Sequence, residues 1–304
     1  MSPSEDSHLE VVLQRVSVVL YILTVILGIC GNAVVIYLAA FKIQTKVTHV
    51  FLVNLAVTDL IFCFSRILSI VYKLRSNDWP FGTFLCKLNG FIKYTNMFCS
   101  VFLLAVISLD RALCVLRPFL IKTKRTLRVV RVVALCVWTL AVAQSIPFYI
   151  HRHLHLDKNN RTLCSVSKDK EKDRKLHLYL LRFVCGFLLP FLVILVCYIL
   201  AGVGINRTKL SRKSRSIRSL AVLVIFFFLC WAPYHCGLLL KLMDIHPQSL
   251  KPWSTLTSVI GYFNSCVNPL LYFCLGGGSG KRPQSKSAQN LQTSHGENLT
   301  DEIV

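Results

Sequence analysis

The chain has 304 residues, of which 54% are hydrophobic and only 16% are charged, and its mean hydropathy is +0.56. About a quarter of the residues of a soluble domain are charged, so long stretches of this chain must lie away from water. The formal net charge is +21. Its bases cluster between apolar runs, a placement that favours lipid headgroups over nucleic acid. We therefore expect a membrane protein with no nucleic-acid partner.

Seven apolar spans follow one another, each long enough for a membrane helix of about 20 residues. They cover Val11–Phe41, Val50–Lys73, Thr83–Leu113, Val129–Ile150, Leu176–Gly204, Ile217–Met243 and Trp253–Leu275. The connections contain charges or prolines that the bilayer centre excludes. The predicted fold class is an all-α membrane protein, a seven-transmembrane-helix bundle. Residues 1–10 form a short N-terminal segment, 11–275 the transmembrane domain and 276–304 a disordered tail.

The distribution of bases orients the bundle. Lysine and arginine gather after the first, third, fifth and seventh spans, which predicts that these segments and the C-terminus are cytoplasmic and the N-terminus extracellular. The residues are Lys42, Lys46, Arg117, Lys122, Lys124, Arg125, Arg128, Arg207, Lys209, Arg212, Lys213, Arg215, Arg218, Lys281, Arg282 and Lys286. The loop 151–175 is also basic, but it is longer and contains balancing acids.

Two features of this outer loop point to the cell exterior. Asn160-Arg161-Thr162 is a glycosylation sequon, which makes Asn160 a candidate glycan site. Cys86 and Cys164 each lie near the end of a span and could pair outside the cell. The other eleven cysteines fall in apolar spans or, for Cys114, directly after one, where cysteine behaves as a small hydrophobe.

An ordered set of motifs runs through the seven spans. It comprises Gly31-Asn32, Leu55-Ala56-Val57-Thr58-Asp59, Cys86, Asp110-Arg111, Trp138, Pro190, Tyr198, Cys230-Trp231-Ala232-Pro233 and Asn268-Pro269-Leu270-Leu271-Tyr272. In this order the set resembles the rhodopsin-like (class A) G-protein-coupled receptors. Cys86 and Arg111 are 25 residues apart, about 37 Å along a helix. That distance places one at the outer mouth and the other at the cytoplasmic face.

Further stretches are similar to one branch of that family, the chemoattractant receptors for formyl peptides, anaphylatoxins, chemerin and prostaglandin D. They are Ser100 to Arg111, Trp79-Pro80-Phe81-Gly82 and Leu229 to His235. The chain departs from the pattern in three places. Ala112 replaces the usual tyrosine, Ser65-Arg66-Ile67 replaces a proline segment, and a glycine run from Gly276 replaces a basic amphipathic helix.

A buried carboxylate in the second span is the first candidate site. Asp59 lies in mid-membrane among apolar residues, where an acid is costly and marks a functional site. Further oxygen ligands around Asp59 would come from Asn96 and Ser100 on one helix face, and from Asn264, Ser265 and Asn268 on another. The resemblance implies an allosteric sodium ion that favours the inactive state. The alternative is a hydrogen-bonded network without an ion, and we expect no other metal or cofactor.

The resemblance also implies an activation machinery. Arg111 pairs with Asp110 at rest and faces the G protein once the sixth helix moves outward. Pro233 and Pro269 kink their helices by removing backbone hydrogen bonds. Trp231, Tyr198 and Tyr272 would act as bulky switches in a two-state element.

Three bases in the outer half of the bundle suggest the ligand. Arg66 lies seven residues after Asp59, about 10 Å nearer the outside. Lys93 follows Cys86 by seven residues, and Arg182 precedes Pro190 by eight. Bases facing lipid at this depth are costly, so we expect them to face the cavity and attract a carboxylate, sulfate or phosphate. The alternatives are snorkelling to the interface or pairing within the protein.

Tyr94, His235 and Tyr262 are expected to line the same cavity. In the resembled branch, a base at the position of Arg182 commonly engages a ligand carboxylate. The seventh span contains no lysine, which excludes a retinal photoreceptor. The sequence has no repeat typical of a transporter and no His and acid cluster typical of a metal hydrolase.

The predicted function is therefore that of a plasma-membrane receptor, not an enzyme. It binds an extracellular anionic ligand, a carboxylate-bearing lipid or a peptide, and signals through inhibitory-class G proteins. The expected partners are that ligand, a heterotrimeric G protein, arrestin and membrane lipids. The alternatives are a chemoattractant peptide receptor or a seven-helix scavenger that binds ligand without signalling.

Overall fold

The computed structural model describes the backbone of residues 3–41, 47–166, 172–208, 211–242 and 250–276. The tail after residue 276 and many of the bases that oriented the chain lie outside the described residues, as does the side chain of Tyr272. By its internal contacts the chain divides into two units, residues 1–271 and residues 272–304. The fold described below is that of the first unit.

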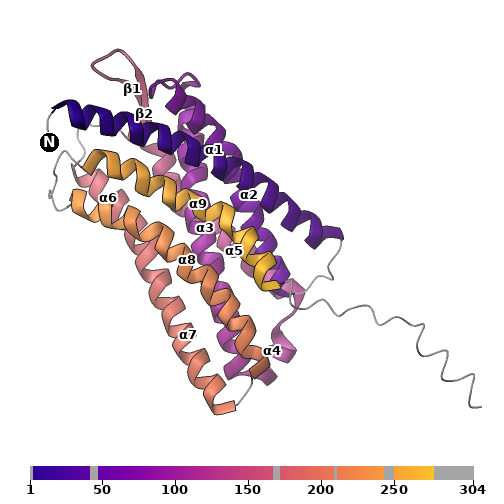
Figure 1. Cartoon of the computed structure of the whole chain (residues 1–304). Coiled ribbons are helices and arrows are strands. Elements are labelled where there is room, and N and C mark those ends of the chain that lie inside the picture. The colour runs from indigo at the N-terminus through magenta and orange to yellow at the C-terminus, as the bar shows by residue number, and fades with distance from the viewer. Residues whose placement is uncertain (1–2, 42–46, 167–171, 209–210, 243–249, 277–304) are drawn as a thin grey trace, which may run out of the picture. The chain divides into compact units, whose positions relative to one another are not determined.

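Long helices pack side by side into a bundle (Figure 1). They are α1 (Pro3–Phe41), α2 (Val47–Leu74), α3 (Gly82–Leu116), α5 (Leu127–Ile150), α8 (Ser211–Leu242) and α9 (Leu250–Gly276), with the fifth predicted helix divided into α6 (Lys172–Phe183), η1 (Val184–Leu188) and α7 (Leu189–Thr208). Six membrane-length apolar helices are found among the described residues. α9 runs through the seventh predicted span, and α1 begins eight residues before the predicted start at Val11.

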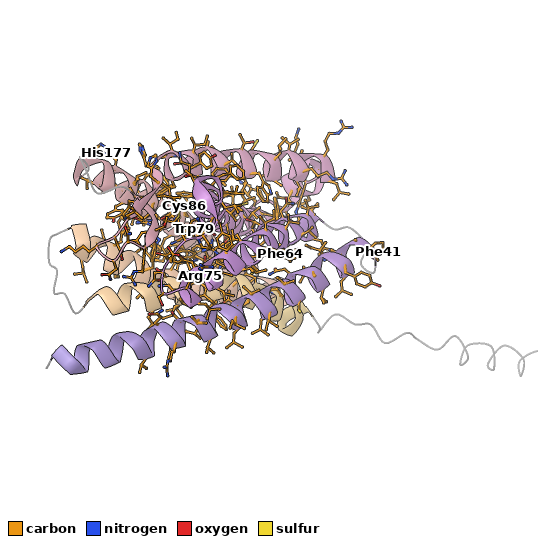
Figure 2. All side chains as sticks on the ribbon, turned by 90° about the horizontal axis from the view of Figure 1, so that it is seen from above. Phe41, Phe64, Arg75, Trp79, Cys86 and His177 are labelled. Atoms are coloured by element: carbon orange, nitrogen blue, oxygen red, sulfur yellow. A yellow bond between two sulfur atoms is a disulfide. The ribbon has the colours of Figure 1, made fainter. Side chains whose placement is uncertain are left out.

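Apolar side chains fill much of the inside of this bundle and also cover its outside. α3 is the central helix, with 17 buried residues, and packs against α2, α5 and α7. Large apolar side chains also cover the outer surface, as Figure 2 shows for Phe41 and Phe64, which are 75% and 53% exposed. A soluble protein rarely exposes so much apolar surface. The arrangement fits a bundle whose outer face contacts lipid.

A π-helical turn interrupts the fifth membrane helix. The Leu189 N–H donates to the carbonyl of Val184, five residues back. Pro190, the next residue, has no N–H to donate and crowds the carbonyl of the preceding turn, which explains why the irregular turn lies here. Gly186 lets this turn approach α3, because a Cβ there would lie 2.7 Å from Met97 Cε.

The outer loop forms a β-hairpin that the sequence analysis did not predict. β1 (Arg152–Leu156) pairs antiparallel with β2 (Thr162–Val166). The predicted disulfide between Cys86 and Cys164 is confirmed and joins α3 to β2. The Trp79 N–H adds a second tie by donating to the carbonyl of Thr162 at 2.8 Å. Trp79 and Cys86, both labelled in Figure 2, are thus both tied to the hairpin strand β2.

The turn of the hairpin is held by one carboxylate. Asp157 accepts hydrogen bonds from the backbone N–H groups of Asn159 and Arg161 and from the Arg161 guanidinium. These bonds, foremost the one from the Arg161 backbone, lower the pKa of Asp157. Asn160, the candidate glycan site, is exposed in this turn. The short helix α4 (Pro118–Lys124) lies at the opposite end of the bundle (Figure 1).

Candidate functional site

The predicted cations of the outer half lie in the bundle interior and share aromatic partners. Lys93 Nζ lies 5.3, 5.1 and 5.0 Å from the ring centroids of Tyr94, Tyr234 and Tyr262. Such contacts between a cation and a ring face are attractive. Because Tyr262 also contacts Arg66 and Tyr234 also contacts Arg182, the three cations form one connected cluster. We call this cluster the cation cavity, after the ligand cavity predicted from the sequence.

Arg182 is almost fully buried, with 3% of its surface exposed. Its Nη1 donates to the hydroxyls of Tyr94, at 2.9 Å, and Tyr234. Its Nε is buried and has no hydrogen-bond partner in the described part of the chain. Tyrosine hydroxyls cannot neutralise a guanidinium, so Arg182 keeps an unsatisfied donor and an uncompensated charge.

Arg66 is buried and is oriented by a residue that the sequence analysis missed. Its Nη2 donates to the side-chain oxygen of Asn89 at 2.5 Å and to the Asn89 carbonyl at 3.2 Å. Ser65 accepts two further bonds. The guanidinium also lies over the Phe62 ring at 4.6 Å. These neutral partners explain how an arginine is accommodated inside α2.

A fourth cation, Arg152 of β1, was also missed. Its guanidinium packs against α3 at Gly90, where a Cβ would lie 2.5 Å from Arg152 Nε. Arg152 Nη1 lies 3.6 Å from Cys164 Sγ of the disulfide, and its buried Nε has no partner among the described residues. Gly90 directly follows Asn89, the residue that binds Arg66, so Arg152 and Arg66 contact the same part of α3. The hairpin therefore brings an additional base to the mouth of the cation cavity.

These four cations have no acidic partner in the part of the chain that is described. The ion pairs found there join Asp110 to Arg111 and Arg125, and Asp157 to Arg161. Buried like charges repel one another and are costly without a counter-charge. The cavity is therefore electrostatically suited to an anion.

Below the cations lies an aromatic floor around His235. Its ring centroid is 4.7 Å from that of Phe187 and 6.1 Å from that of Phe183. Both ring nitrogens are buried without a hydrogen-bond partner among the described residues. Trp231 lies 6.4 Å from His235 and is packed tightly against α9, since a Cβ on Gly261 would lie 3.2 Å from the indole.

The predicted polar cluster around Asp59 also comes together. Asp59 is fully buried and accepts hydrogen bonds from Asn96 at 2.7 Å and Asn268 at 2.8 Å. Ser265 donates to Asn96 at 3.3 Å. Ser100 Oγ and Asn264 Oδ1 are buried, and neither has a partner among the described residues. These two buried oxygens thus have no described donor.

At the cytoplasmic end, Asp110 is shared by two arginines. Arg111 Nη2 lies 3.1 Å from it, as the resemblance implied. Arg125, just beyond α4, binds it more closely through two parallel contacts of 2.7 and 2.8 Å. The sequence analysis had used Arg125 only to orient the chain. A planar guanidinium facing both carboxylate oxygens is a strong, directional contact.

The remaining predicted switch residues lie on the expected helices. Tyr198 is half-buried on α7, Pro233 lies within α8, and Pro269 lies within α9. A Cβ on Gly31 of α1 would lie 3.0 Å from Pro269 Cβ, so this glycine lets α1 and α9 touch. Asn32 reinforces the contact by donating to the Ser265 carbonyl at 2.9 Å.

Comparison with known proteins agrees with this architecture. The sequence-family model for the seven-transmembrane receptors of the rhodopsin family matches residues 31–272 of this chain. The chain therefore belongs to this family.

Similar relatives define the branch. C5a anaphylatoxin chemotactic receptor 1 of Danio rerio is 35% identical over 270 residues, which cover 86% of this chain and 78% of that receptor. Chemerin-like receptor 1 of Sus scrofa is 35% identical over 281 residues, 85% and 76% of the two chains. Formyl peptide receptor 2 of Mus musculus is 34% identical over 289 residues, 89% and 82%. The chain is thus a G-protein-coupled receptor of the chemoattractant type, a multi-pass protein of the plasma membrane, as predicted, and its relatives are receptors rather than enzymes.

Proposed function

We propose that this receptor is activated by an extracellular ligand that carries a carboxylate or a comparable anionic group. The observation that carries the proposal is the cation cavity, where Arg66, Lys93, Arg152 and Arg182 have no acidic partner among the described residues. A ligand anion would supply the missing counter-charge. Arg182 would bind it directly through its unpartnered Nε, and the hydroxyls of Tyr94 and Tyr234 would add donors.

The aromatic floor suggests the rest of the ligand. Phe183, Phe187 and His235 offer an apolar surface next to the anion site, and the His235 ring offers a hydrogen bond that no described residue takes. An amphipathic molecule with an acidic end and a long apolar body would satisfy both regions. This favours a carboxylate-bearing lipid mediator.

A chemoattractant peptide is the second candidate. It has support of its own, because the similar receptors are named for C5a, chemerin and formyl peptides. A peptide with a free C-terminal carboxylate would present the same anion to Arg182. A non-signalling scavenger would use the same cavity but would leave the cytoplasmic machinery idle.

Activation would pass from the floor of the cavity through Trp231 to the cytoplasmic end. A ligand that packs on His235 would press on the indole 6.4 Å away, and Pro233 gives α8 a flexible point about half a turn above Trp231. Outward movement of α8 would release Arg111 towards an inhibitory-class G protein. Asp59, with Asn96, Ser100, Asn264, Ser265 and Asn268, would hold a sodium ion in the resting state, and its two unpartnered oxygens support that role.

The test is a screen of acidic lipid mediators and short peptides on cells that express the receptor. Nucleotide exchange on an inhibitory-class G protein is measured alongside ligand uptake. We expect exchange with an acidic ligand and none with its methyl ester. Uptake without exchange would identify a scavenger, and equal potency of acid and ester would rule out the anion site.

A further inference from the structure

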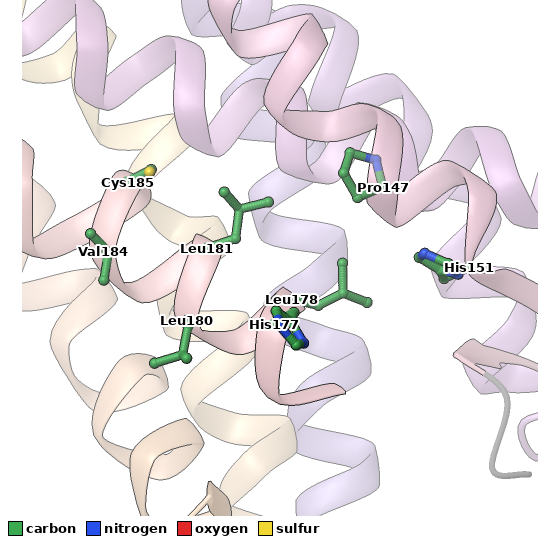
Figure 3. Close-up of a pocket in the computed structure, with 8 residues that line it drawn as sticks. All are labelled: Pro147, His151, His177, Leu178, Leu180, Leu181, Val184 and Cys185. Carbon is green, nitrogen blue, oxygen red and sulfur yellow. The ribbon is translucent and has the colours of Figure 1, made fainter. Parts of the chain in front are cut away.

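A groove of about 530 Å³ lies outside the helix bundle, between the end of α5 and α6. Its walls are Pro147 and His151 on one side and, on the other, His177, Leu178, Leu180, Leu181, Val184 and Cys185 (Figure 3). None of these residues belongs to the cation cavity. The groove belongs to the outer third of the membrane helices, because the span that contains α6 begins at Leu176.

The groove is lined almost wholly by apolar surface, and two histidines are among its lining residues. Leu178 and Leu181 extend from α6 towards Pro147 (Figure 3). His151 caps α5 at its outer end, and His177 lies in the middle of α6, one residue into the membrane span that begins at Leu176. Because the receptor spans the plasma membrane, the apolar part faces acyl chains and the two imidazoles lie near the level of the headgroups. An imidazole donates a hydrogen bond whether it is neutral or charged.

We propose that this groove is a binding site for a long-chain fatty acid, with its chain along the leucines and its carboxylate at His151 and His177. A volume of this size is typical of small-molecule sites, about 300–1,000 Å³. None of the lining residues is acidic, so nothing in the groove repels a carboxylate. A molecule with one apolar chain and one acceptor group matches the two chemical parts of the groove.

The groove and the cation cavity are lined by different side chains of one helix. Leu181 lines the groove, whereas its neighbour Arg182 binds Tyr94 and Tyr234 inside the bundle. Val184 and Cys185 of the π-helical turn complete the groove wall. The two sites can therefore be tested separately, because a substitution at Arg182 leaves every groove residue unchanged.

The experiment uses the full-length receptor in phosphatidylcholine nanodiscs. The probe is a palmitic acid that carries a diazirine on the chain and a terminal alkyne, and labelled peptides are mapped by mass spectrometry after irradiation. We expect labels on peptides that contain Pro147 or the segment from Leu178 to Cys185. Unlabelled oleic acid should compete, whereas the methyl ester of the probe should label poorly.

Matched variants then separate the groove from general contact with lipid. Val184→Trp fills the groove, and Leu180→Trp fills it from another position. Val193→Trp is the control, because Val193 is a lipid-facing valine of α7 with nearly the same exposure, 41% against 40% for Val184. We expect either groove variant to abolish labelling and the control to retain it. Replacing both His151 and His177 by leucine should abolish the preference for the acid over the ester.

Three results would overturn the proposal. The first is labelling that survives both tryptophan variants in monodisperse receptor. The second is a groove that takes up a photoactivatable cholesterol or phosphatidylcholine but not the fatty acid. The third is loss of labelling in Arg182→Gln, which would place the probe in the cation cavity. That last result would leave the anionic-ligand proposal intact, and retention of labelling in this variant supports the groove.

Discussion

The two ends of the bundle treat charge in opposite ways. At the outer end, Arg66, Lys93, Arg152 and Arg182 are surrounded by tyrosines and amides, and no described carboxylate pairs with them. At the cytoplasmic end, Asp110 has two arginine partners within 3.1 Å. The outer end has cations without an acidic partner among the described residues, whereas at the cytoplasmic end two arginines share one carboxylate.

This difference separates two uses of buried charge. An ion pair that the chain completes itself can hold a resting conformation and break when the conformation changes. A set of cations without acids raises the energy of the unliganded cavity, so a ligand anion gains both the new contacts and relief of the repulsion. The outer end is therefore organised for recognition and the inner end for switching.

Arg182→Gln is the substitution expected to break the outer end most severely. Glutamine retains some hydrogen-bonding capacity but loses the charge and the unpartnered Nε. Truncating one partner of a buried charged pair costs about 2–5 kcal/mol, so we expect the affinity for an acidic agonist to fall by about 100-fold or more. Radioligand displacement measures the change.

Two comparisons sharpen that result. Arg75→Gln removes an arginine from the exposed outer surface and should leave affinity nearly unchanged. The methyl ester of the agonist should bind the original receptor and Arg182→Gln with similar weak affinity, because the lost interaction is with the carboxylate. A fall in affinity of the same size for acid and ester would mean that Arg182 acts on folding rather than on the anion.

Asp59→Asn tests a third region of buried charge, in mid-membrane. The question is whether a bound ion neutralises the Asp59 carboxylate. A bound cation stabilises the folded state by linkage, and each kcal/mol raises the Tm of a domain of this size by about 2–4 °C. We expect sodium chloride to raise the Tm of the purified receptor above that in choline chloride, and Asp59→Asn to remove the difference. Asp157→Asn is the control and should retain it. If sodium has no effect on the original receptor, the hydrogen-bonded network needs no ion.

Arg125→Gln weakens the switching end. Without its two contacts to Asp110, the resting arrangement of the cytoplasmic end loses one of its two arginine partners. We expect basal nucleotide exchange to rise about 5-fold, the lower end of the usual range of coupling between conformational states. Arg128→Gln is the matched control, since Arg128 is exposed on α5. If the basal rate stays unchanged in Arg125→Gln, the contact between Arg125 and Asp110 does not restrain the resting state, and the pair of Arg111 with Asp110 would do so.

Hydropathy predicted the helices well, because each membrane helix is a continuous apolar run whose length the bilayer sets. It could not predict the hairpin. The strand Arg152–Leu156 reads Arg-His-Leu-His-Leu, and a five-residue polar alternation in a loop has no distinctive signal. Its structure depends on the disulfide and on the Trp79 bond to β2, both of which join segments about 80 residues apart.

The candidate site was predictable where a charge lies inside an apolar span. Arg66, Lys93 and Arg182 stand out in that way, whereas Arg152 lies two residues beyond the span that ends at Ile150 and looks like an ordinary loop base. Arg125 was hidden in the same manner among cytoplasmic bases. Asn89 and Tyr234 carry no charge, so only their contacts with Arg66 and Arg182 reveal their part in the cavity.

Asp157→Asn tests how far the hairpin positions the outer cations, and we expect the smallest effect of the series. The amide cannot attract the Arg161 guanidinium as a carboxylate does, so the turn loosens, while the disulfide still holds β2. Because folding lowers the pKa of Asp157, its contribution is present above the ordinary carboxylate range and is lost as the pH falls through the lowered value. Hydrogen exchange of the hairpin amides at neutral pH should quicken, and acidic-agonist affinity should fall by only about 2-fold. A much larger fall would mean that the hairpin turn, and not only the disulfide, holds Arg152 at the mouth of the cation cavity.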